Sequence, residues 1–155
     1  MPVSNGISYR KALQNDSQLI LDMEGICFGK SDAFTFSQIH HFLKNPAGSI
    51  ITDIIEYQNN PAGWAVYFKR KNSSIVRLYS ICIVPEFSGR GIAQIYLSER
   101  INSFQNFKTI VLEVREGNKK AVYLYEKLGF KTIKKLKSYY PDNEDGLRMQ
   151  RNTWI

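Results

Sequence analysis

The feature that most limits how this chain can fold is a glycine-containing turn that joins a strand-like run to a helical pattern. Residues 75–85 read IVRLYSICIVP, and a short polar stretch then leads into the glycines and the helix. Backbone N–H groups at the start of a helix attract anions, and glycine lets the backbone approach a ligand closely. The turn therefore predicts a phosphate-binding site, formed by the backbone of Gly89, Arg90, Gly91, Ile92, Ala93 and Gln94.

Hydrophobic periodicity divides the rest of the chain into short strands and helices. A turn is expected at NNPAG. A helix of about a dozen residues is expected after the glycine turn, and its inward face is formed by Ile92, Ile95, Tyr96 and Ile101. Gly129 is expected to end a later helix. The order of elements favours one mixed sheet covered by helices. Strands are predicted over residues 6–13, 49–57, 64–71, 75–85, 108–114, 131–140 and 146–154. The other helices are predicted over residues 18–28, 35–45 and 118–130, and either Asp16 or Ser17 is expected to cap the first of them.

Length and composition favour a single domain over residues 1–155. Cys27 and Cys82 lie far apart in the sequence, which argues against a disulfide framework or a metal site and fits the cytoplasm. The start of the chain lacks the apolar core of a signal peptide, and no apolar run suggests a membrane partner. The net charge is +7, but the basic residues are dispersed, so we expect a solvated surface and no nucleic-acid partner.

Comparison of the turn with known phosphate-binding motifs distinguishes between the possible ligands. No P-loop pattern is present, and Gly89-Arg90-Gly91 lacks the third glycine of a dinucleotide-binding fingerprint. The stretch ICIVPEFSGRGIAQ instead resembles the acyl-CoA signature of the GNAT acetyltransferase superfamily, with Ser88 where that family has Gln or Arg. This departure affects one side-chain contact to the diphosphate, whereas the backbone contacts do not depend on it.

The resemblance recurs downstream. NKKAVYLYEKLGF matches the family pattern Asn-x-x-Ala-x-x-Leu-Tyr-x-x-x-Gly-Phe at every named place. The resemblance implies an α+β GNAT fold, with a central mixed and splayed sheet of six to seven strands and about four helices. It also implies that acetyl-CoA is the co-substrate, with no metal, and that Asn118 contacts it; Asn118 could equally cap the helix.

Two residues are candidate catalytic groups. In the family, a tyrosine at the place of Tyr125 lies near the CoA sulfur, which implies a general acid; a packed aromatic side chain is the alternative. Glu113 lies in an otherwise apolar strand, where an unpartnered carboxylate is costly to bury. A salt bridge or an exposed face of the strand would explain it, but LEVREGN closely resembles the sequence of the enzymes that acetylate protein N-termini, which implies a general base.

Further site residues follow from the same resemblance. Ile81, Cys82 and Ile83 are expected to expose backbone groups beside the CoA arm, and an N–H near Ile83 could hold an oxyanion. Cys82 is expected to be a packed small residue rather than an acetyl-carrying nucleophile. Tyr139, in SYYPDNEDGLRM, resembles a residue of the C-terminal hairpin of N-terminal acetyltransferases. It would grip the acceptor or simply close the sheet.

The acceptor stays open at this stage. An α-amine has a pKa of about 7.7–8.0 against about 10.4 for lysine, so more of it is neutral near pH 7. We therefore expect transfer to a protein or peptide N-terminus, with lysine or a polyamine-type small amine as alternatives. A CoA-sensing or protein-binding module on the same fold is the non-enzyme alternative. A monomer or a homodimer would fit either case.

Overall fold

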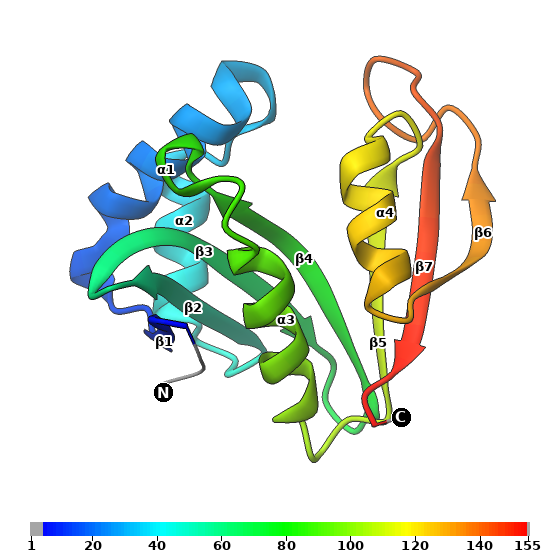
Figure 1. The fold of residues 1–155 in the computed structure, drawn as a ribbon, viewed down its shortest axis with the longest axis horizontal. Helices are drawn as coiled ribbons and strands as arrows, with labels where there is room; N and C mark the ends of the chain where they lie inside the picture. Colours follow the sequence, from blue (N-terminus) through cyan, green and yellow to red (C-terminus); the bar gives the residue numbers. More distant parts are fainter. Residues whose placement is uncertain (1–4, 155) are drawn as a thin grey trace.

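A computed structural model describes residues 5–154 as one seven-stranded mixed sheet with helices on both faces (Figure 1). The sheet order is β1-β2-β3-β4-β5-β7-β6, and β4 and β5 form its parallel pair. The element order and the mixed α/β class predicted from the sequence are confirmed; residues 1–4 and 155 of the expected domain lie outside the described residues. The elements are β1 (Ile7–Lys11), α1 (Ser17–Asp32), α2 (Phe36–Lys44), β2 (Ile50–Tyr57), β3 (Asn60–Lys69), β4 (Ile75–Ile83), α3 (Ile92–Asn102), β5 (Thr109–Arg115), α4 (Lys119–Lys127), β6 (Lys131–Leu136) and β7 (Gly146–Asn152).

The turn expected at NNPAG is wrong in position. Gln58 and Asn59 have φ of 49° and 66° and form a two-residue connection, so β3 already begins at Asn60. Positive φ at both central residues is typical of the tight turn that matches the twist of a hairpin. Pro61 is accommodated inside β3 because it faces a register shift between Ile55 and Glu56 of β2.

Helix termini follow local hydrogen bonding. Thr35 caps α2 by accepting a hydrogen bond from the Gln38 backbone N–H at 3.2 Å. Asp16 occupies the N-cap position of α1, as one of the two predicted alternatives, but its carboxylate does not cap the helix. It accepts hydrogen bonds from Arg10 and from the Leu13 backbone N–H instead. Gly129 follows α4 with φ of 91°, which is the expected left-handed helix end.

Two apolar cores lie on opposite faces of the sheet. Residues of α1 and α2 pack with Trp64 and Val66 of β3 on one face. Residues of α3 and α4 pack with Leu112 and Val114 of β5 on the other face. The predicted inward face of α3 is confirmed for Ile92, Tyr96 and Ile101, which are buried, whereas Ile95 is partly buried against the same core.

The parallel strands β4 and β5 pair along only part of their length. Their register runs from Ile75 opposite Thr109 to Leu78 opposite Leu112, and no pairing is recorded beyond it in the described residues. At this point β4 also shifts register against β3, which leaves Tyr79 as an extra residue. Such a bulge bends its strand. The two strands diverge above it (Figure 1), which confirms the splayed sheet predicted from the resemblance. None of the helices within residues 5–154 has the length and apolar character needed to span a bilayer.

Candidate functional site

A cavity of about 1010 Å³ occupies the gap between β4 and β5. Leu112 and Val114 of β5 belong to the core under α3 and α4, so Glu113 and Arg115 point to the opposite face of the sheet. Because both kinds of residue line the cavity, it passes through the split sheet from one face to the other. All predicted site residues except Arg90 line it: Ile81, Cys82, Ile83, Gly89, Gly91, Ile92, Ala93, Gln94, Glu113, Asn118, Tyr125 and Tyr139.

The glycine turn forms one end of the cavity. Gly89 and Gly91 have φ of 77° and 72°, a conformation that glycine adopts without strain. Gly91 is the N-cap of α3, and neither a side-chain cap nor an acidic residue in the first turn satisfies the N–H groups of this helix end. The Ser88 hydroxyl donates to the Pro85 carbonyl at 2.8 Å and so serves the turn itself. These features suit an anion held by backbone N–H groups. The Arg90 guanidinium lies over the Tyr57 ring at 5.4 Å instead.

The free edge of β4 forms the wall next to the turn. The Val84 N–H donates to Ala62 of β3, and a Cβ placed on Gly63 would overlap the Cys82 carbonyl oxygen. The backbone groups of Val84 and Cys82 therefore face β3, so the expectation that Cys82 exposes its backbone groups beside the CoA arm is wrong. Since backbone groups alternate along a strand, those of Ile81 and Ile83 face the gap. The amide of Ile83 is thus on the side where an oxyanion contact was predicted.

The two cysteines lie together at this wall, although they are 55 positions apart in the sequence. The Cys27 thiol donates a hydrogen bond to the Ile83 carbonyl at 3.6 Å, and its interaction with Cys82 lowers the pKa of the Cys27 thiol. The same interaction, together with burial, raises the pKa of the Cys82 thiol. Cys82 is buried in the core under α1 and α2, which agrees with the expectation of a packed residue. A thiol with a raised pKa is a poor nucleophile near neutral pH.

Glu113 accepts hydrogen bonds from three side chains, which lie on β4, on β7 and on the loop between β6 and β7. Its Oε1 accepts hydrogen bonds from Arg77 Nη2 and the Tyr139 hydroxyl, both at 2.5 Å. Its Oε2 accepts from Arg148 Nη2 at 2.7 Å and Nε at 3.1 Å. Burial would raise the pKa of Glu113, but the hydrogen bonds from Tyr139 and Arg148 and the charges of both arginines lower it below its usual value. The salt-bridge explanation of this carboxylate is thus correct, and Glu113 is ionised near neutral pH.

Tyr125 lies on the other side of the split, in α4. Its ring packs edge-on against Phe130 with centroids 5.7 Å apart, and its side chain reaches the cavity although only 8% of the residue is exposed. Burial raises the pKa of Tyr125 to about 12. No hydrogen bond of this hydroxyl to another part of residues 5–154 is recorded. Tyr125 therefore carries a proton near neutral pH that it can donate to a ligand.

Asn118 and Tyr139, the remaining predicted residues, also line the cavity. The Asn118 side chain accepts a hydrogen bond from the Ala121 N–H at 3.2 Å, so it caps α4 at the edge of the cavity. Tyr139 is 46% exposed and stands edge-on to Tyr140 at 5.1 Å, beside Glu113. Within residues 5–154, no group of three or more His, Cys, Asp or Glu side chains gathers to hold a metal ion.

Comparison with known proteins gives the family. The model of the acetyltransferase (GNAT) family matches residues 17–130, which include both glycines, Glu113 and Tyr125. The chain belongs to this family. Its fold also matches solved structures across nearly the whole chain. The ribosomal-protein-S18-alanine N-acetyltransferase of Escherichia coli has a TM-score of 0.84 at 19% identity, over 96% of this chain and 95% of that one.

Two further similar proteins differ in the acceptor that their names state. This GNAT chain is 39% identical over 94 residues to an N-alpha-acetyltransferase of Saccharolobus solfataricus, covering 57% of the chain and 56% of that protein. It thus spans about half the length of the curated relatives it matches. The spermidine N-acetyltransferase of Vibrio cholerae, solved with CoA and spermine, has a TM-score of 0.82 at 20% identity, over 97% of both chains. At that identity the likeness shows the GNAT fold alone.

Sequence reasoning missed the arginines of this GNAT site. Arg77 and Arg148 interrupt apolar strand patterns, as Glu113 does, and that shared irregularity was the available signal. Arg115 stands in LEVREGN directly beside the recognised motif residues, yet only the structure shows its carboxylate partners, which are Asp32, Asp142 and Glu144.

Proposed function

We propose that the chain is an acetyl-CoA-dependent N-acetyltransferase of the cytoplasm that transfers an acetyl group directly to a primary amine. The observation that carries the proposal is the path of one cavity. It joins the uncapped start of α3 to the free edge of β4, and through the split sheet to Glu113 and Tyr139. An anionic co-substrate and an amine can thus meet from opposite faces.

The residues present fit acetyl-CoA. The N-terminal amides of α3 and the left-handed glycines make a cradle for a diphosphate, and Lys120 adds a positive charge at the cavity. The gap-facing amides of Ile81 and Ile83 can bond an extended amide-containing arm as a neighbouring strand would. Asn118 caps α4 with its Oδ1, which leaves its amide N–H groups for a ligand. The bound co-substrate supplies an acetyl group activated as a thioester.

The protein groups then act at defined atoms. The Ile83 N–H donates to the carbonyl oxygen of the acetyl group, which stabilises the charge that develops there. Tyr125 donates its hydroxyl proton toward the departing sulfur. Cys82 takes no part in bonding because it is buried and its pKa is raised, which favours direct transfer over an acetyl-cysteine.

Glu113 is the general base in this proposal, and its hydrogen bonds within the protein determine when it can accept a proton. A carboxylate accepts about four hydrogen bonds, and Glu113 receives four within the protein. One donor must leave before Glu113 can accept the amine proton, directly or through water. Tyr139 is the donor that an acceptor can displace, because it stands on an exposed loop whereas both arginines are fixed on strands. Tyr139 thereby contacts the incoming acceptor.

The acceptor in this proposal is the α-amine of a peptide or protein N-terminus. The similarity to N-alpha-acetyltransferases in sequence favours it, and the lower pKa of an α-amine reduces the demand on a base whose own pKa is lowered. A small polyamine is the second candidate, because spermidine acetyltransferases are among the close matches of fold. The enzyme would act as a monomer or a homodimer, with no membrane or nucleic-acid partner.

Thiol release from acetyl-CoA tests these alternatives. The acceptors are a lysine-free peptide beginning with Ala, the same peptide N-terminally blocked and carrying one Lys, and spermidine. We expect turnover with the first and at least tenfold less with the others. Faster release with spermidine would transfer the assignment to the second candidate. Binding of acetyl-CoA in calorimetry without release for any acceptor would leave a CoA-binding module, and no binding would remove the proposal altogether.

A further inference from the structure

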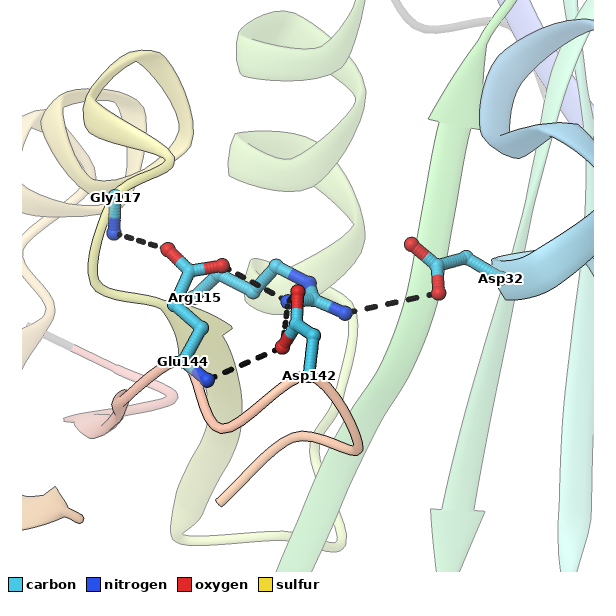
Figure 2. Close-up of polar contacts among 5 residues, drawn as sticks. All are labelled: Asp32, Arg115, Gly117, Asp142 and Glu144. Atoms are coloured by element: carbon cyan, nitrogen blue, oxygen red, sulfur yellow. Dashed lines mark hydrogen bonds and ion pairs between the residues drawn. The ribbon is translucent and has the colours of Figure 1, made fainter. Parts of the chain in front are cut away.

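Arg115 connects the segments that surround the acceptor end of the cavity (Figure 2). Its Nη1 lies 2.8 Å from Glu144 Oε1 and 2.9 Å from both carboxylate oxygens of Asp142, in the loop between β6 and β7. Its Nη2 lies 3.6 Å from Asp32, the last residue of α1. Its guanidinium also lies over the Tyr140 ring at 4.3 Å. One side chain thus joins β5, the loop and α1.

The loop is folded to fit this arginine. Glu144 Oε2 accepts a hydrogen bond from the Gly117 N–H at 3.0 Å, and a Cβ on Gly117 would overlap that oxygen. The Glu144 N–H donates to Asp142 at 3.1 Å, so the two carboxylates converge on Arg115. The hydrogen bonds to Glu144 and Asp142 raise the pKa of the arginine, and the charges of Asp142 and Asp32 add to this effect. Because three carboxylates meet one guanidinium, the contacts reinforce one another.

The same arrangement places the two tyrosines of the loop. Glu113 and Arg115 point to the same face of β5, two residues apart. Tyr139 bonds to Glu113, and Tyr140 packs on Arg115. Arg115 therefore sets the distance between the loop that carries Tyr139 and the end of α1, and both border the cavity where an acceptor must enter.

We propose that Arg115 is the positioning residue for the acceptor, through Asp32 on one side and Asp142 and Glu144 on the other. This inference rests on the proposed function. None of the contacts recorded for Arg115 within residues 5–154 is with the glycine turn or with Ile81–Ile83, so its loss should impair binding of the amine and not of acetyl-CoA. An interaction that holds the acceptor equally in the ground state and in the transition state contributes to KM and not to kcat, so its loss should appear in KM.

The test replaces Arg115 by Gln, with Arg10→Gln as the matched control. Arg10 also binds two carboxylates, at 2.8 Å from Asp16 and 3.8 Å from Glu56, but it lies on β1 away from the cavity. For Arg115→Gln we expect the KM of the Ala-initiated peptide to rise about tenfold, with kcat and the Kd of acetyl-CoA within about twofold. Arg10→Gln should leave all three at wild-type values. An unchanged KM in Arg115→Gln would overturn the inference.

A second readout does not need turnover. Amide hydrogen exchange should rise in Arg115→Gln both in residues 138–145 and in residues 29–36, because Arg115 holds both segments. Faster exchange in the loop alone would show that Arg115 does not position α1, and the inference would fail even if the enzyme proved inactive. Should Arg115→Gln not fold, Asp32→Asn removes the α1 contact alone and should raise the KM by a smaller factor, with exchange changed only in residues 29–36. A wild-type KM and wild-type exchange in that variant would overturn the inference as well.

Discussion

Replacing Tyr125 by Phe should slow the chemical step while leaving the fold intact. The substitution removes one hydroxyl and keeps the ring that packs against Phe130. Since no hydrogen bond of this hydroxyl to the described residues is recorded, its removal leaves no buried partner unsatisfied. We therefore expect the melting temperature to stay close to that of the wild type.

The size of the kinetic effect follows from the pKa values. Burial raises the pKa of Tyr125 to about 12. An ordinary thiol has a pKa of about 8.5, so complete transfer of the proton to sulfur would be uphill by several kcal/mol, on the order of 5 kcal/mol. Tyr125 is therefore expected to share its proton in a hydrogen bond to the departing sulfur. A hydrogen bond to a charged group contributes about 1.5–3 kcal/mol. Its loss should lower kcat roughly 10- to 150-fold.

Steady-state thiol release under saturating acetyl-CoA measures this effect, with Tyr123→Phe as the control. Tyr123 lies on the same helix but is 64% exposed, so loss of its hydroxyl should change neither kcat nor stability. An unchanged kcat in Tyr125→Phe would refute the role of Tyr125. A loss far beyond 150-fold at an unchanged melting temperature would refute the hydrogen-bond argument and favour complete proton transfer.

Two further predictions concern the glycine turn that would hold the diphosphate and the carboxylate of Glu113. Gly91→Ala forces a side chain into a left-handed conformation at φ of 72°, which costs about 1–2 kcal/mol, so both the melting temperature and the affinity for acetyl-CoA in calorimetry should fall. Gly25→Ala, in an open position within α1, should be neutral or stabilising, and equal behaviour of the two variants would contradict the reasoning. Glu113 has a lowered pKa, so its ion pairs stabilise the fold above the unfolded pKa of about 4.3, and this contribution disappears as the pH falls through the folded value. The difference in melting temperature between wild type and Glu113→Gln should therefore be full at pH 7 and shrink as the pH falls below about 4, and a difference that is constant with pH would be inconsistent with this linkage.

The sequence was sufficient for the order of elements, because strand and helix periodicities are local properties. It was insufficient where a local signal competed with the register of the sheet. The stretch NNPAG has the composition of a turn, but the chain reverses one residue earlier, at Gln58 and Asn59. The bulge at β2 then lets Pro61 enter a strand. A turn composition therefore located the hairpin but not its central residues.

The residues of the candidate site could likewise be predicted only in part from the sequence. Contiguous motifs predicted the glycine turn, Asn118 and Tyr125, and the structure brings these residues to one cavity. The sequence motifs did not predict the partners of Glu113, because Arg77 and Arg148 lie on other strands, 36 and 35 positions away along the chain. Their approach to Glu113 depends on the strand order β4-β5-β7 and on its register. Only the assembled sheet gives that information.

The alternation of β5 links chemistry to acceptor binding. On one face, Leu112 and Val114 join the core that holds α4, and thereby fix Tyr125 beside the gap. On the other face, Glu113 and Arg115 receive Tyr139 and Tyr140 of the loop that borders the acceptor end. A slip of one residue in the pairing of β5 would exchange the two sets, burying charges against α4 and turning leucine and valine to the face that carries the loop tyrosines. The continuous pairing of β5 with β7, from Thr109 to Arg115, opposes such a slip. We infer that this pairing stabilises the base and the acceptor-positioning arginine together, because neither can keep its place if the other moves to the opposite face.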